Sequence, residues 1–199
     1  MLFRSEGAVL LVSHDRAFLR AVANRVVELR DGGLVSYPDG YDAYLERKAQ
    51  EASRQEEMEA EAAREAAEEV AGSGIPVFLA SHPTPTPAAS YAVVARGTSG
   101  AIVITASHNP YIWNGVKFKA AYGGSASPAI MKKVEAELTR VVHSGARAHR
   151  AKNSTIEKVD LVTPYLENLK SKVQMDRIRS SGLKFVADPM YGAADRKST

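Results

Sequence analysis

A serine, a histidine and an asparagine stand together in residues 105–110, directly after a short apolar run. The hydroxyl of Ser107 can be phosphorylated or act as a nucleophile. The imidazole of His108 can move protons near neutral pH. Asn109 followed by Pro110 favours a tight turn that would push the serine outward. These residue types indicate a reactive loop, and an ordinary turn is the alternative that they leave open.

Two lysines follow this loop at short range. Polar and apolar residues alternate over residues 115–121, which predicts a half-exposed strand carrying Lys117 and Lys119. Their positive charges suit an anionic substrate. The run before the loop, residues 101–105, is β-branched and apolar, as in a buried parallel strand. Reactive groups of α/β proteins lie at the carboxyl ends of such strands.

The elements that must position the loop indicate an α/β layer fold. We expect strands over residues 75–80, 101–105, 115–121 and 183–190. We expect helices over residues 88–96, 127–142 and 161–181, the last broken near Val173. Ser127 is the expected N-cap of the second helix, with Pro128 at its first position. Three prolines exclude regular structure over residues 81–87, and the basic residues 146–156 are expected to form a connection.

The preceding segment differs in composition. Residues 46–69 hold nine glutamates and four Arg or Lys residues, a net charge of −5 in a chain of net charge +3. Strong helix formers dominate it, and glycines at 72 and 74 with Pro76 end it. Since its only apolar residues are Ala, Met and one Val, we expect a solvated helix over residues 46–70.

Composition excludes several functions. The 199 residues contain no cysteine, which excludes disulfides, thiolate metal sites and a cysteine nucleophile. The longest apolar run near the start, residues 8–12, is too short for a signal peptide or a membrane span. We therefore expect a cytoplasmic protein without a membrane partner. Lys and Arg are scattered, so no nucleic-acid partner is expected.

Residues 75–194 resemble the α-D-phosphohexomutase superfamily, the phosphoglucomutases and phosphomannomutases. The resemblance rests on the motifs GIPVFLA, PTPTPAA, GAIVITASHNP, NGVKFK and VADPMYGAA. It implies that Ser107 carries a phosphoryl group exchanged with a hexose phosphate, such as glucose 1-phosphate or glucose 6-phosphate. It further implies acid–base and charge-stabilising roles for His108 and Lys117, and Mg²⁺ held partly by the phosphate on Ser107. Asn109 and Lys119 are the expected substrate-binding residues.

The chain also departs from this family. Residues 97–100 (GTSG) copy the start of a family motif but lack its arginine, so we interpret them as a helix-to-strand turn. The family's Asp-Gly-Asp-x-Asp-Arg loop for Mg²⁺ is absent, and Mg²⁺ needs several oxygen ligands. Ser107 alone therefore cannot hold the ion, and we expect the isolated chain to be an incomplete, inactive mutase.

Residues 7–48 resemble the C-terminal end of an ABC-F type ATP-binding cassette ATPase, a class that acts on ribosomes. The resemblance makes His14 the switch histidine that touches the γ-phosphate of ATP. The phosphate-binding Gly-x-x-x-x-Gly-Lys-Ser/Thr loop is absent, so nothing cradles the phosphates. We therefore interpret His14 as vestigial, a loop histidine without a ligand.

These observations predict an α/β fold with a partial mixed or parallel sheet and flanking helices. The expected parts are an ATPase fragment (1–45), a charged helical linker (46–70), a first mutase domain bearing the phosphoserine loop (71–150), and a connection with the start of a second domain (151–199). Two alternatives to a mutase stay open: an ABC-F tail that binds the ribosome, and a non-functional chimera of two gene fragments.

Overall fold

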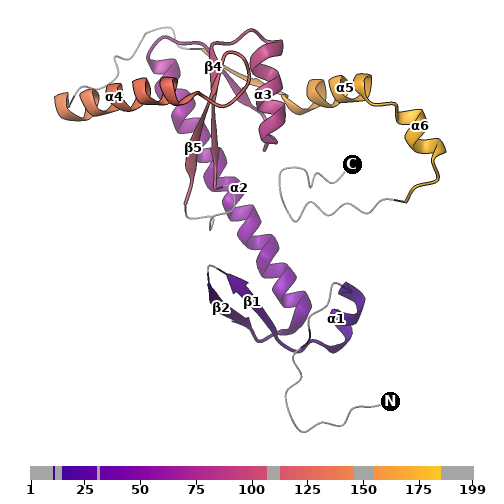
Figure 1. Cartoon of the computed structure of the whole chain (residues 1–199). Coiled ribbons are helices and arrows are strands. Elements are labelled where there is room, and N and C mark those ends of the chain that lie inside the picture. Colours follow the sequence, from indigo (N-terminus) through magenta and orange to yellow (C-terminus); the bar gives the residue numbers. More distant parts are fainter. Residues whose placement is uncertain (1–10, 12–14, 31, 107–112, 146–154, 185–199) are drawn as a thin grey trace. The chain divides into compact units, whose positions relative to one another are not determined.

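The structure is a computed structural model that describes residues 11, 15–30, 32–106, 113–145 and 155–184 (Figure 1). The chain divides into two units, Met1–Glu51 and Ala52–Thr199. Helix α2 (Gly40–Gly72) contributes its first turns to the first unit and the rest to the second.

The first unit contains a short helix and a hairpin. Helix α1 (Arg16–Val22) begins where the Asp15 carboxylate accepts a hydrogen bond from the Phe18 amide at 3.0 Å. Strands β1 (Val26–Arg30) and β2 (Gly33–Tyr37) pair in antiparallel register.

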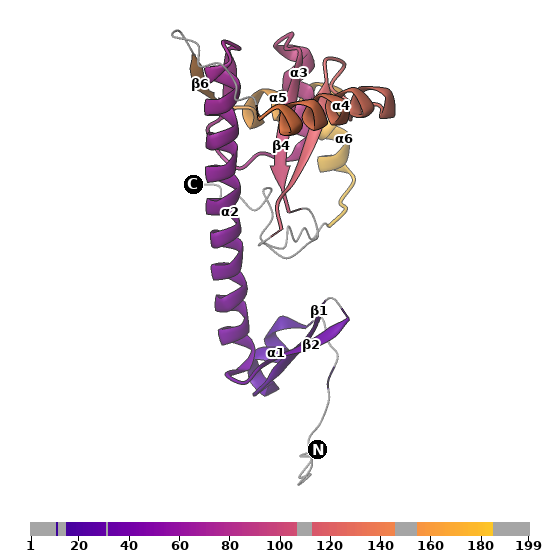
Figure 2. The ribbon, with the colours of Figure 1, turned by 90° about the vertical axis from the view of Figure 1, so that its left-hand side faces the viewer.

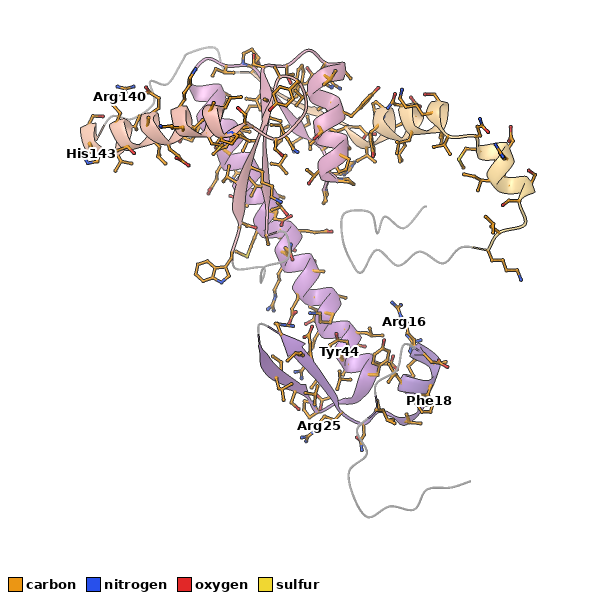
Figure 3. The ribbon with its side chains drawn as sticks, viewed as in Figure 1. Arg16, Phe18, Arg25, Tyr44, Arg140 and His143 are labelled. Atoms are coloured by element: carbon orange, nitrogen blue, oxygen red, sulfur yellow. The ribbon has the colours of Figure 1, made fainter. Side chains whose placement is uncertain are left out.

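An ionic network links this hairpin to the start of α2. The Glu28 carboxylate accepts hydrogen bonds from Arg30 at 2.6 Å, from the Tyr37 hydroxyl at 2.9 Å and from Lys48 at 3.2 Å. Burial acts to raise the pKa of Glu28, but these hydrogen bonds outweigh it and lower the pKa. Burial and the hydrogen bond to Glu28 raise the pKa of Tyr37. Tyr44 of α2 (Figure 3) meets the Tyr37 ring edge-on at 5.0 Å.

Helix α2 is longer than the predicted linker. It runs without a break from Gly40 to Gly72, and the expected glycine-rich stop is confirmed. Arg64 pairs with Glu61 and Glu68 on the exposed surface, as expected for a solvated helix. The prediction that this helix is solvated is wrong near its C-terminal end, where Ala67 and Ala71 are buried.

The strands of the second unit form two separate pairs. Strands β3 (Val77–Ala80) and β6 (Ile156–Val159) are parallel, whereas β4 (Gly100–Thr105) and β5 (Gly115–Ala120) are antiparallel. The α/β class is confirmed, with small parallel and antiparallel sheets among the described residues in place of one partial mixed sheet.

The prediction of a buried parallel strand over residues 101–105 is wrong. Ile102 in β4 is 43% exposed. Only nine residues separate Thr105 from Gly115, and a parallel crossover needs about a dozen or more. The short connection therefore selects the antiparallel pairing.

Helix α3 (Thr86–Ala95) lies against the β4–β5 pair, as Figure 2 shows, and also contacts α5. Helix α4 (Pro128–Ser144) begins after Ser127, whose hydroxyl accepts from the Ile130 amide at 3.4 Å, which confirms the predicted cap. Helices α5 (Val162–Lys172) and α6 (Met175–Ser180) are separated at Val173, as expected. The strand expected at residues 183–190 lies almost entirely outside the described residues.

The described core is small and built mainly from alanine. Its members are Tyr37 in the first unit, and Ala67, Ala71, Ala88, Ala89, Val93, Ala106 and Val159 in the second. Many larger apolar side chains within the described ranges, including Val116 and Leu138, are exposed. No helix in these ranges has both the length and the apolar character needed to span a bilayer.

Candidate functional site

The predicted reactive loop lies outside the described residues. This holds for Ser107, His108 and Asn109. The structure describes the framework on both sides of the loop: Ala106 before it, and Trp113 and the following residues after it.

Strands β4 and β5 bring the two sides of the loop together. Thr105, the last residue of β4, pairs with Gly115, the first residue of β5. Residues 106–114 therefore join two strand ends that lie opposite each other. Lys117 and Lys119 pair with Val103 and Ala101, so both lysines lie on the strand that is hydrogen-bonded to the one leading to Ser107.

The two lysines project from the same face of β5, because side chains two residues apart in a strand share a face. Lys117 is exposed and Lys119 is half-buried. The described residues include no ion-pair partner for either side chain. Two ammonium groups on one strand face form a positive surface that can neutralise a phosphate.

A tight turn fixes the other end of β5. Gly123 has φ 81° in this turn, and its amide donates to the Ala120 carbonyl at 2.8 Å. A Cβ at Gly123 would lie 2.6 Å from the Ser90 carbonyl oxygen and 2.9 Å from Cγ2 of Val94, both in α3. Helix α3 therefore packs directly against the turn that ends the lysine strand, which makes the strand part of a packed layer.

A glutamate from α2 reaches the residue before the loop. The Ala106 amide donates to Oε1 of Glu59 at 2.9 Å, and Gln55 Nε2 donates to the same oxygen at 3.0 Å. Ala106 is 1% exposed and Glu59 is half-buried. Sequence reasoning missed Glu59, because it is one of many glutamates in a charged helix and lies 47 residues from its partner. No local pattern distinguishes it.

The GTSG segment is a turn, as predicted. The Thr98 amide donates to the Val93 carbonyl at 3.0 Å, which closes the end of α3. The Thr98 hydroxyl donates to the Gly100 carbonyl at 3.3 Å, at the start of β4. The segment therefore joins a helix to a strand. His14, the expected vestigial nucleotide-binding residue, lies outside the described residues.

The described residues do not fit a magnesium site. No three His, Cys, Asp or Glu side chains gather closely enough within the described ranges to hold a metal ion. Mg²⁺ requires near-octahedral oxygen coordination.

A shallow cavity of about 210 Å³ lies between α3 and the start of α5. Tyr91, Arg96, Asp160 and Pro164 are among its lining residues. The Asp160 carboxylate accepts hydrogen bonds from the amides of Val162 and Thr163, the first two residues of α5. Neither lysine of β5 lines this cavity.

Comparison with known proteins relates the second unit to a family of sugar-phosphate enzymes. Residues 57–144 match the family described as "Phosphoglucomutase/phosphomannomutase, alpha/beta/alpha domain I". A phosphoglucosamine mutase of Ralstonia pickettii is 37% identical over 67% of this chain and 29% of its own length. A phosphoglucomutase of Komagataeibacter xylinus is 26% identical over 94% of this chain and 35% of its own length. The chain thus spans about a third of these relatives.

Two further similarities accompany these. A solved structure from Thermus thermophilus, assigned as a phosphomannomutase, is 38% identical, covers 54% of this chain and 23% of its own chain, and has a TM-score of 0.47. The ABC transporter F family member 2 of Arabidopsis thaliana is 46% identical over 28% of this chain and 8% of its own length.

Proposed function

Since the chain belongs, over residues 57–144, to the phosphohexomutase superfamily, we propose that Ser107 accepts a phosphoryl group from a hexose phosphate. The observation that carries the proposal is the β4–β5 pair, which brings a positive strand face beside the strand that leads to Ser107. The proposal takes Ser107, His108 and Lys117 as catalytic residues. Asn109 and Lys119 would bind the substrate.

The proposed step is transfer from a hexose bisphosphate. The bond between phosphorus and the sugar oxygen breaks, and a bond between phosphorus and the Ser107 hydroxyl oxygen forms. The serine proton passes to His108, and the leaving sugar oxygen takes a proton from the same imidazole. Phosphoryl transfer depends on positioning and charge neutralisation more than on covalent chemistry. Lys117, exposed on β5, supplies positive charge for the transferring group.

The substrate class is a hexose or hexosamine phosphate. Similarity to a phosphoglucomutase and to phosphoglucosamine mutases supports this breadth. The same family generally uses Mg²⁺, which remains part of the proposal for the complete enzyme. For the 199 residues of this chain, the proposal concerns the acceptance of phosphate on Ser107.

The test is incorporation of labelled phosphate from glucose 1,6-bisphosphate, mapped by peptide mass spectrometry. We expect label on Ser107 and none in Ser107→Ala. Lys117→Met should slow incorporation on the order of a hundredfold, the usual effect of removing one charge-stabilising group. Lys133→Met, at an exposed lysine of α4, is the matched control and should leave the rate unchanged.

Two results would contradict the proposal. The first is equal incorporation in the parent chain and in Ser107→Ala, which would locate the acceptor elsewhere. The second is equal slowing by Lys117→Met and Lys133→Met, which would show that the rate depends on the net charge of the protein and not on the position of Lys117.

A second candidate function is ribosome binding. The similarity to an ABC-F protein over 28% of the chain favours it. The acidic α2 would be repelled by RNA phosphates, which bind Lys and Arg. Salt-sensitive cosedimentation with ribosomes would support this candidate, whereas no cosedimentation at low salt would exclude it. A chimera of two gene fragments instead predicts that long DNA reads separate the two matched regions.

A further inference from the structure

A single carboxylate oxygen holds the backbone immediately before the predicted reactive loop. Oε1 of Glu59 accepts from the amide of Ala106 and from the side-chain amide of Gln55, at 2.9 Å and 3.0 Å. Gln55 precedes Glu59 by one helical turn, so both side chains lie on the same face of α2. The second hydrogen bond restricts the orientation of the carboxylate that receives the first.

The Ala106 amide needs this acceptor. Ala106 is 1% exposed, and it follows Thr105, the last residue paired in the β4–β5 ladder. A buried amide without an acceptor destabilises the fold. Hydrogen bonds to an ionised carboxylate are stronger than neutral ones, so Glu59 both satisfies this amide and fixes the direction in which the chain leaves β4.

We propose that Glu59 is a positioning residue, which anchors the Ala106 amide and so fixes where the segment bearing Ser107 begins. The proposal rests on the proposed function, because it assigns to Glu59 an effect on phosphoryl transfer to Ser107. Glu59 acts through Ala106 and does not touch the substrate. The long acidic helix thereby acquires a role beyond that of a linker.

The anchoring is tested by amide hydrogen exchange in the isotope-labelled chain. Glu59→Ala should accelerate exchange at Ala106 by roughly 10- to 100-fold, the size expected for a hydrogen bond to a charged group. Glu59→Gln retains an acceptor oxygen and should accelerate exchange only a few-fold. Glu57→Ala, at an exposed glutamate of the same helix, is the matched control and should leave Ala106 unchanged.

The positioning effect is tested by single-turnover phosphate transfer from glucose 1,6-bisphosphate to Ser107. Glu59→Ala should lower the maximal rate about tenfold or more, with the half-saturating bisphosphate concentration unchanged. Glu59→Gln should restore most of the rate. Loss of folded protein alone would lower the amplitude of Ser107 phosphorylation in proportion to the folded fraction. It would leave the rate constant and the half-saturating concentration of the folded molecules unchanged. Far-UV circular dichroism and Trp113 fluorescence measure the folded fraction.

Unchanged exchange at Ala106 in Glu59→Ala would overturn the anchoring. Faster exchange with an unchanged maximal rate would overturn the positioning effect. If Glu59→Ala fails to fold, the exchange rate of the Ala106 amide is measured in Glu59→Gln instead. Exchange as fast as in the unfolded chain would show that the side-chain oxygen of residue 59 does not accept a hydrogen bond from Ala106. Absence of phosphate on Ser107 in the parent chain would overturn the proposed function, whereas the exchange result would still decide the anchoring.

Discussion

Replacement of Glu28 by alanine should loosen the β1–β2 hairpin, because three donors converge on its carboxylate. Arg30 and Lys48 each keep a second acceptor, the Glu51 carboxylate at 3.2 Å. The Tyr37 hydroxyl instead loses the oxygen to which it donates at 2.9 Å, and Tyr37 is 4% exposed. Most of the cost should therefore come from the tyrosine.

The size of the effect follows from these contacts. A buried donor left without an acceptor costs about 1–3 kcal/mol, and half-exposed ion pairs add about 0–1 kcal/mol. We expect Glu28→Ala to lower the free energy of unfolding of the hairpin by about 2 kcal/mol. Tyr37→Phe should cost about 1 kcal/mol. The double variant should cost about 2 kcal/mol, which gives a coupling energy of about 1 kcal/mol between the two side chains.

The assay is hydrogen exchange at the amides of β1 and β2, which reports local opening. Trp113, the only tryptophan of the chain, lies in the second unit. Its fluorescence in a urea titration is therefore an internal control, and its transition should not move. A coupling energy near zero would refute the hydrogen bond as the cause. An equal shift of the Trp113 transition would refute a local effect.

Three further predictions concern pH and packing. The hydrogen bonds lower the pKa of Glu28 below its ordinary value of 4.5. The stabilising effect of Glu28 is therefore complete above pH 4.5 and is lost as the pH falls through the lower pKa of the folded state. Protection of the β1 and β2 amides from hydrogen exchange should fall in this acidic range, and protection that does not change with acid would contradict the network. Gly123→Ala should destabilise the second unit by about 2 kcal/mol or more in a Trp113-monitored urea titration, since φ is 81° and the new Cβ meets backbone at 2.6 Å. Gly145→Ala has the same backbone penalty without the clash, so equal costs would refute the close packing. Ala88→Leu, at a position of 0% exposure, should lower the free energy of unfolding by about 1–3 kcal/mol through overpacking. The urea midpoint of Trp113 fluorescence should fall accordingly, and an unchanged midpoint would show that the site can expand.

Short-range signals in the sequence predict several elements correctly. The cap at Ser127 and the proline after it start α4 because a hydroxyl satisfies a free amide within the same turn. The glycines after α2 end it for an equally local reason. The alternation over residues 115–121 predicts β5 with Lys117 and Lys119 on it. Each signal acts over a few residues, so the element can be predicted from its own residues without knowledge of its tertiary partners.

Strand pairing could not be predicted in the same way. The sequence of β6, Ile-Glu-Lys-Val, contains two charges in four residues and does not stand out as a strand. It becomes one because β3, far away in the chain, supplies a parallel partner. The apolar run of β4 is compatible with parallel or antiparallel pairing, and the short connection to β5 decides between them.

Some features of the candidate site can likewise be predicted from the sequence, whereas others depend on tertiary packing. The serine, histidine and asparagine of the loop and the two lysines are predicted from the sequence alone, because their types and spacing are read directly. The packing of the fold places Lys117 on the strand paired with β4 and brings Glu59 to the Ala106 amide from 47 residues away. A hydrogen bond between a helix and a distant strand end leaves no periodic trace in the chain, because its geometry exists only after both elements have packed.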